Sequence, residues 1–167
     1  MTKVQRVLGG LIAGVLAFFG SNALDARRPS DMAAKSETVE DRTITVRIDR
    51  PFATVSDFLA NPANWNQWAF GLGKNIRHSA EGWIAESGEG TAKVRFTPRN
   101  KFGVVDHTVI RASGQRVYVP MRLIANGSGC ELLFTLFREP KMSDTQFDSD
   151  AEFVQRDLNR LKSLMEK

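Results

Sequence analysis

The feature that most constrains the fold is a long apolar stripe at the C-terminal end of the chain. The spacing of its members places them on one face of an α-helix, which Phe153 and Leu164 widen. Ser143 is suited to cap this helix, and Gln146 three residues later completes a capping box. About 22 residues at ~1.5 Å each give a rod long enough to cross a whole sheet. Spacings of four and three residues alternate along the stripe: Phe147, Ala151, Val154, Leu158, Leu161 and Met165.

A series of short strands precedes this helix. Ile44, Val46 and Ile48 alternate with polar residues, which is typical of a half-buried strand. Turns rich in Gly, Asn and Ser separate the strands that follow, and such closely spaced strands favour an antiparallel meander. The sequence therefore predicts an α+β domain in which the sheet curls around the C-terminal helix. The later strands are predicted near 75–80, 83–86, 90–97, 104–111, 116–125 and 130–138.

Two short helices are predicted between the first strand and the meander. The first covers about 53–59. The second begins at Asn61, a residue type suited to the N-cap, followed by Pro62 at the first helical position. This second helix leads directly to Trp65 and Trp68, so both indoles are expected where the helices meet the sheet.

The first 23 residues have the order of a secretory signal peptide. Lys3 and Arg6 precede an uninterrupted run of apolar residues and glycine over 7–20, and small residues follow at Ser21 and Ala23. We expect residues 1–23 to direct export to the periplasm and to be cleaved. Residues 24–42 are then a linker, and residues 43–167 form the ligand-binding domain.

Two other interpretations of this segment stay open. The uncharged stretch continues to Leu24, so the segment is also compatible with an uncleaved membrane anchor. Alternatively, Met32 is the true start, and the protein is cytoplasmic. The membrane is expected as a partner only through the N-terminal segment, and only if that segment is not cleaved.

Charge and cysteine content exclude several classes of function. The chain has 23 basic and 19 acidic residues, but part of the basic excess lies in its first 28 residues. No basic stripe with interleaved aromatics is present, so nucleic-acid binding is not expected. Cys130 is the single cysteine, and no Cys/His cluster is spaced to hold a metal. We therefore expect no metal site and no cofactor.

Several segments resemble the START-like (SRPBCC) superfamily. The stretch 48–59 is similar to its first strand and helix, and 61–68 to the segment that follows. Four later stretches are similar to bacterial members often labelled polyketide cyclase or dehydrase-like: 100–107 (NKFGVVDH), 119–122 (VPMR), 129–131 (GCE) and 134–138 (FTLFR). The resemblance covers about 43–167.

The resemblance implies a helix-grip fold: a curved antiparallel sheet of about six to seven strands around the long C-terminal helix, with two short helices after strand 1. It also implies a cavity between sheet and helix, open near the short helices. Such a fold does not fix an activity, because the superfamily contains lipid carriers, cyclases, hydrolases and co-chaperones.

Asp106 and His107 are the candidate polar groups of this cavity. Neighbours on a strand point to opposite faces, so only one of them can face inward. An inward His107 could serve as an acid or base, or orient a ligand carbonyl. An inward Asp106 would need a partner, and Arg122 on a nearby strand is the obvious one. Such a pair is more often structural than catalytic.

Apolar side chains are the candidate ligand-binding residues. Trp65, Trp68 and Phe70 are predicted at the rim of the cavity, where aromatic rings favour the desolvation of apolar ligands. Core packing is the alternative role for the same residues. His107 joins this set as its polar member, and the predicted walls are Phe96, Met121, Phe134, Val154 and Leu158.

Three functions follow from this sequence. The first is binding or carriage of a small hydrophobic or amphipathic ligand. The second is a polyketide cyclase or dehydratase-like enzyme that uses His107 or Asp106 as acid or base. The third is a protein-interaction module, as in co-chaperone relatives, with an outward patch around Tyr118 or Phe137 and no internal cavity. The sequence leaves both catalysis and the oligomeric state open.

Overall fold

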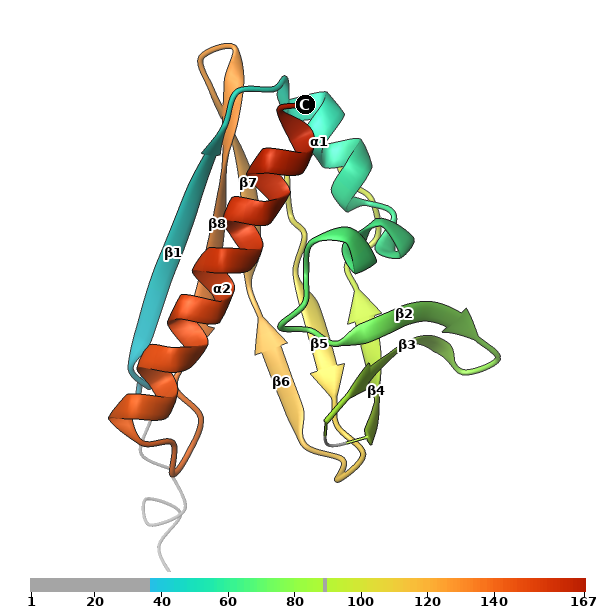
Figure 1. Ribbon diagram of the computed structural model, residues 1–167, viewed down its shortest axis with the longest axis vertical. Coiled ribbons are helices and arrows are strands. Elements are labelled where there is room, and N and C mark those ends of the chain that lie inside the picture. Colours follow the sequence, from blue (N-terminus) through green and yellow to red (C-terminus); the bar gives the residue numbers. More distant parts are fainter. Residues whose placement is uncertain (1–36, 89) are drawn as a thin grey trace, which may run out of the picture. The chain divides into compact units, whose positions relative to one another are not determined.

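The computed structural model describes residues 37–88 and 90–167, and within them it contains a curved antiparallel sheet and one long helix (Figure 1). The expected signal peptide lies outside the described residues, as do residues 24–36 of the expected linker. The first strand begins at Asp41, two residues before the predicted start of the domain at residue 43. The elements are β1 (Asp41–Ile48), α1 (Phe52–Leu59), η2 (a 3₁₀ helix, Pro62–Gln67), β2 (Lys74–Ser79), β3 (Gly82–Ser87), β4 (Gly90–Phe96), β5 (His107–Ile110), β6 (Arg116–Val119), β7 (Met121–Asn126), β8 (Gly129–Phe137) and α2 (Asp144–Met165).

The strands form two antiparallel groups that meet at Pro120. Their orders are β1-β8-β7 and β2-β3-β4-β5-β6. Pro120 has no N–H to donate to a neighbouring strand, and the chain passes there from one group to the other. The Pro120 carbonyl accepts a hydrogen bond from the Thr135 N–H at 3.0 Å, and Val104 forms an isolated antiparallel bridge with Arg122.

The predicted α+β helix-grip architecture is confirmed, with eight strands where six to seven were expected. The strand predicted over 116–125 is divided into β6 and β7 by Pro120. The strand predicted over 104–111 is shorter, because regular pairing begins only at His107. The other predicted strands lie within about two residues of β1, β2, β3, β4 and β8.

Helix α2 begins and packs as the stripe predicts. The Ser143 hydroxyl accepts a hydrogen bond from the Gln146 N–H at 3.2 Å, and the Gln146 side chain accepts one from the Ser143 N–H at 3.0 Å. The side chains of Phe147, Leu158 and Leu161 are fully buried. Each such side chain contributes roughly 1.5–3 kcal/mol through burial. The helix runs alongside β1 (Figure 1).

The two short helices are fixed by polar contacts to the backbone. The Asn61 side chain accepts a hydrogen bond from the Ala63 N–H at 3.1 Å, as its N-cap position predicts. The Trp65 indole Nε1 donates to the Leu59 carbonyl at 2.9 Å and thereby connects η2 to the end of α1. At the far end of α2, the Asp49 N–H donates to the Glu166 carboxylate at 2.7 Å. No helix in the described part of the chain is both long enough and apolar enough to cross a membrane.

Candidate ligand-binding cavity

A cavity of about 600 Å³ lies between the sheet and α2. Small-molecule sites are commonly roughly 300–1,000 Å³ and mostly apolar. On β5 and β6 the strand period of two brings inward residues opposite one another, since His107 pairs with Val119 and Val109 with Val117. Apolar side chains from the sheet and α2 make much of the wall: Val109, Val117, Val119, Phe134, Leu136, Val154 and Leu158.

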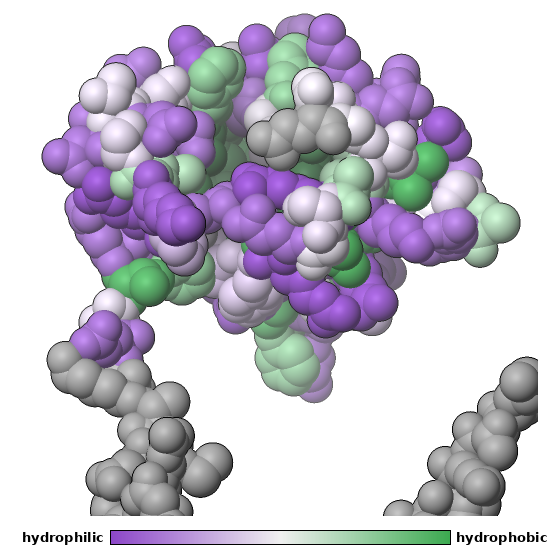
Figure 2. All heavy atoms as spheres, turned by 90° about the horizontal axis from the view of Figure 1, so that it is seen from below, coloured by the Kyte–Doolittle hydropathy of each residue, from purple (hydrophilic) through white to green (hydrophobic). Residues whose placement is uncertain are grey.

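The lining residues divide into an exposed rim and a buried interior. Phe70 and Phe153 belong to the rim and are half-exposed. A guanidinium lies over each of these rings, Arg160 over Phe70 and Arg156 over Phe153, both at 4.1 Å from the ring centroid. Figure 2, a view from below, shows a hollow with mainly hydrophilic residues around it and more hydrophobic residues within. The rim is therefore amphipathic, whereas the interior is apolar.

Asp157, on α2, holds the loop that carries Phe70 and Gly71 against this helix. Its carboxylate accepts a hydrogen bond from the Gly71 N–H at 2.6 Å and pairs with Arg160 at 3.0 Å. Burial raises the pKa of Asp157, and hydrogen bonds from the backbone of Gly71 and Phe70 oppose that rise. Sequence reasoning missed this residue. The available signal was its spacing, three residues after Val154 and four before Leu161, on the apolar stripe itself.

A second charged group lines the cavity between the β5–β6 hairpin and the loop after β8. Arg111 donates two hydrogen bonds to the Glu139 carboxylate, at 2.7 and 2.9 Å, and Gln115 adds a third at 2.7 Å. Burial, followed by the charge of Glu139, raises the pKa of Asp150, while Arg111 opposes this rise. Sequence reasoning missed this cluster too, because its members are far apart along the chain.

His107 is the polar side chain that β5 places in the buried interior. It is 5% exposed and packs edge-on against Trp65, with the ring centroids 5.0 Å apart. Burial lowers the pKa of His107 to about 4, and the Val105 backbone carbonyl opposes that change. The imidazole is therefore neutral near pH 7. Its Nδ1 has no hydrogen-bond partner, and neither has Nε1 of Trp68, which is 2% exposed.

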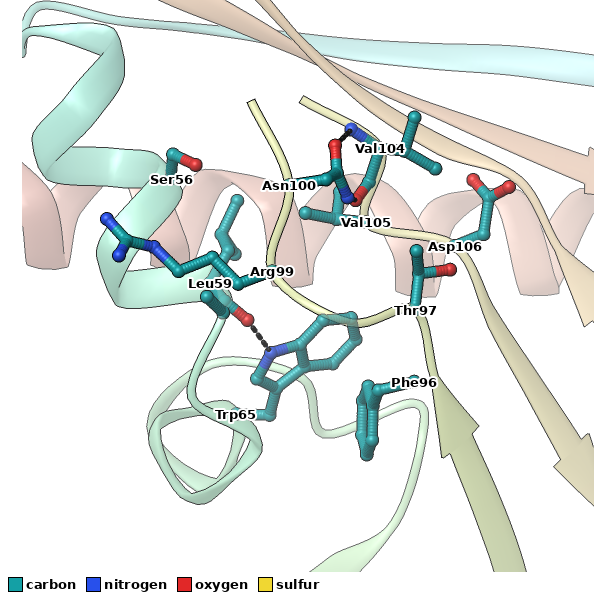
Figure 3. A pocket seen from close by; sticks show the side chains of 11 residues that line it. Ser56, Leu59, Trp65, Phe96, Thr97, Arg99, Asn100, Val104, Val105 and Asp106 are labelled. Carbon is teal, nitrogen blue, oxygen red and sulfur yellow. Dashed lines mark hydrogen bonds between the residues drawn. The ribbon is translucent and has the colours of Figure 1, made fainter. Parts of the chain in front are cut away.

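Asp106 lies on the other face of the strand and does not line this cavity. Its carboxylate accepts hydrogen bonds from the Tyr118 hydroxyl at 2.5 Å and the Met121 N–H at 2.7 Å, and it forms an ion pair with Arg122. In Figure 3 the Asp106 carboxylate lies away from the rings of Trp65 and Phe96. The small hollow drawn there holds about 20 Å³, room for about one water molecule. The hydrogen bonds and the ion pair of Asp106 with Arg122 are typical of a structural pair.

Removing the Asp106 carboxylate should weaken the fold without affecting the cavity. We expect Asp106→Ala to lower the free energy of unfolding by about 2 kcal/mol, because it leaves the buried Met121 N–H without an acceptor. Tyr118→Phe, which removes one hydrogen bond at a half-exposed ring, should cost about 0.5–1 kcal/mol. Urea denaturation measures both losses. A variant of normal stability that no longer binds apolar ligands would contradict the structural role of Asp106.

Seven of the nine predicted ligand-binding residues line the cavity: Trp65, Trp68, Phe70, His107, Phe134, Val154 and Leu158. Phe96 and Met121 do not. The Phe96 ring packs edge-on against Trp65 at 4.9 Å, and Met121 is 1% exposed. Their predicted role as cavity walls is therefore not supported by their position. Of the three aromatic residues predicted at the rim, Phe70 is half-exposed there, whereas Trp65 and Trp68 are each 2% exposed and lie in the interior. Among the described residues, no group of three or more His, Cys, Asp and Glu side chains is placed to hold a metal ion.

Sequence comparison and structure comparison give different results. No protein-family model matches the chain, and no curated protein matches it either. Solved structures do match. Protein MLL2253 from Mesorhizobium loti aligns with a TM-score of 0.56 at 13% identity, over 75% of this chain and 96% of that one. Protein BH1534 from Bacillus halodurans aligns with a TM-score of 0.59 at 13% identity, over 77% and 98%.

A third match is the Aha1 dimer from Colwellia psychrerythraea, with a TM-score of 0.55 at 14% identity, over 76% of this chain and 96% of that one. At such low identity the likeness concerns the fold and not the activity. It agrees with the arrangement of sheet, short helices and α2 described above. The protein therefore has a helix-grip fold, which these solved structures share.

Proposed function

We propose that the protein binds and carries a small hydrophobic or amphipathic molecule in the cavity between the sheet and α2. The observation that carries this proposal is the cavity itself, about 600 Å³ with a largely apolar wall. An apolar molecule that moves from water into such a space gains roughly 25 cal/mol for each Å² of apolar surface it buries. The half-exposed Phe70 and Phe153 at the rim would assist its transfer.

A cyclase or dehydratase-like activity is the second candidate, and His107 is the observation that favours it. Its Nδ1 is unpartnered in the cavity and could accept a proton from a substrate. Two features favour carriage instead. A pKa of about 4 makes His107 a weak base, and two of the three carboxylates in the described cavity lining, those of Glu139 and Asp157, are engaged by Arg111 and Arg160. Turnover that disappears in His107→Ala while ligand affinity persists would favour the enzyme.

A protein-interaction module is supported less well. Tyr118 and Phe137 are exposed to 51% and 37%, as that interpretation requires. The Tyr118 hydroxyl, however, is bonded to Asp106, and the interpretation expects no internal cavity. Membership of the polyketide cyclase-like subgroup is likewise a proposal, and it rests on the resemblance of segments of the sequence to that subgroup.

Filling the cavity should abolish binding. We expect Val109→Trp to raise the Kd of the fluorescent probe 1-anilinonaphthalene-8-sulfonate at least about tenfold, because an indole would occupy space that the isopropyl group leaves open. Ile124→Trp is the matched control, since Ile124 is half-exposed on β7 and does not line the cavity. Circular dichroism should show both variants folded. Equal probe affinity in both variants and in the wild-type protein would contradict binding in this cavity.

We also propose that residues 1–23 direct export and are then removed. Native mass spectrometry of the protein expressed from its full reading frame tests both proposals together. The expected result is a polypeptide whose mass corresponds to a chain that begins near Leu24, with a bound molecule of low mass. A full-length polypeptide mass would contradict cleavage, and release of no small molecule under denaturing conditions would count against a carrier purified in its loaded form.

A further inference from the structure

Two buried nitrogen atoms of the cavity lining lack hydrogen-bond partners, Nε1 of Trp68 and Nδ1 of His107. Both rings pack against Trp65, with centroid distances of 4.8 Å for Trp68 and 5.0 Å for His107. The two side chains therefore belong to one region of the interior. The Trp65 indole itself differs, because its Nε1 donates to the Leu59 carbonyl at 2.9 Å.

Unpartnered nitrogens in an apolar interior point to a ligand atom. Buried polar groups in folded proteins are nearly always hydrogen-bonded, because burial removes their bonds to water. An indole N–H can only donate, so Trp68 requires an acceptor. The imidazole of His107 is hydrogen-bonded to the Val105 backbone carbonyl, and because Nδ1 has no partner the donor is Nε2. A neutral ring that donates at Nε2 accepts at Nδ1. A hydroxyl group complements both atoms, because it accepts from Trp68 and donates to His107, whereas a carbonyl oxygen complements Trp68 alone.

The acceptor is expected to be uncharged. Burial lowers the pKa of His107 to about 4, so the ring supplies no positive charge near neutral pH. Among the described lining residues the cations are Arg111, Arg156 and Arg160. Arg111 is paired with Glu139 and Arg160 with Asp157, while Arg156 lies over the exposed Phe153 ring. A carboxylate beside Trp68 and His107 would be buried without a counter-charge, which is costly.

We propose, on the basis of the proposed carrier function, that the ligand is a largely apolar molecule with one uncharged oxygen group, a carbonyl or a hydroxyl, which binds between Trp68 and His107. Its oxygen accepts the hydrogen bond from Trp68 Nε1. The apolar remainder lies along Val109, Val117 and Leu136 toward the rim.

Three probes of one carbon skeleton test this proposal: 2-acetylnaphthalene, 1-(2-naphthyl)ethanol and 2-ethylnaphthalene. They carry a carbonyl, a hydroxyl and no oxygen. We expect the wild-type protein to bind at least one oxygen-bearing probe about tenfold more tightly than 2-ethylnaphthalene, as measured by isothermal titration calorimetry. Trp68→Phe, which keeps a ring but removes the N–H, should abolish that preference. Trp83→Phe should preserve it, because Trp83 does not line the cavity.

The outcomes separate this inference from the carrier function. If all three probes bind equally and Trp68→Phe changes none of them, the proposed polar site is wrong while the carrier function stands. If no probe binds, both are overturned. Should Trp68→Phe fail to fold, the infrared carbonyl stretch of 2-acetylnaphthalene bound to the wild-type protein decides. A shift below its frequency in hexane supports the hydrogen bond, and an unshifted band overturns it.

Discussion

Trp65→Ala should lower the free energy of unfolding by about 4 kcal/mol, the largest loss that we expect from one substitution near the cavity. The indole is 2% exposed and contacts the rings of Trp68 and Phe96, with centroids 4.8 and 4.9 Å away. Truncation at such a site removes buried apolar surface and leaves a void that rigid neighbours cannot fill. It also leaves the Leu59 carbonyl without its donor.

Guanidinium denaturation followed by far-ultraviolet circular dichroism measures this loss. Trp65→Phe is the informative control, since it keeps a ring but removes the hydrogen bond to Leu59, and it should cost about 1–2 kcal/mol. Trp83→Ala is a second control at a partly buried ring outside the cavity wall, and it should cost less than Trp65→Ala. A loss below about 1 kcal/mol for Trp65→Ala would show that the ring is not essential to this end of the fold.

The regular elements could be predicted because their determinants are local. The α2 stripe and the Ser143–Gln146 capping box lie within a few residues of one another, and so do Asn61 and Pro62. The division of one predicted strand into β6 and β7 was foreseeable from Pro120, since proline removes a ladder hydrogen bond and is rare within central strands.

The face of the strand at Asp106 and His107 could not be predicted. Alternation determines that the two side chains point to opposite faces, but it does not determine which face is inside. Contacts with residues that are distant in sequence determine which of the two side chains faces inward. Asp106 is held by Tyr118, Met121 and Arg122, and His107 is packed by Trp65. The structure therefore places His107, and not Asp106, in the cavity lining.

Charged residues of the rim were missed for a related reason. Arg111 meets Glu139 across 28 positions, and Asp157 meets the Gly71 backbone across 86. Pairs of this kind arise only when the chain curls the sheet around α2. They matter for function because they neutralise the charges that border an apolar interior. The chemistry of the site is therefore determined by tertiary structure, even where each element follows from local sequence.

Acidification should destabilise the protein through His107, by about 3 kcal/mol between pH 7 and pH 4. The pKa of its imidazole falls from 6.5 to about 4 on burial. Between these values the unfolded chain binds more protons than the folded one, so the free energy of unfolding decreases as the pH falls. One pKa unit is worth about 1.4 kcal/mol, which gives the stated magnitude. The contribution of the buried neutral His107 to the free energy of unfolding is present above about pH 6.5 and is lost as the pH falls toward 4.

Urea denaturation at pH 7 and pH 4.5, carried out on the wild-type protein and on His107→Phe, isolates this contribution. The variant keeps an aromatic ring and lacks the titrating group, so it should lose about 2–3 kcal/mol less than the wild-type protein over this interval. Asp150 and Asp157, whose pKa values are raised, act in the opposite direction, but they are common to both proteins and cancel in the difference. His78→Phe, at an exposed position, should behave as the wild-type protein does. Equal acid losses in His107→Phe and the wild-type protein would show that His107 is not buried in its neutral form, and would remove the argument that the cavity receives an uncharged ligand group.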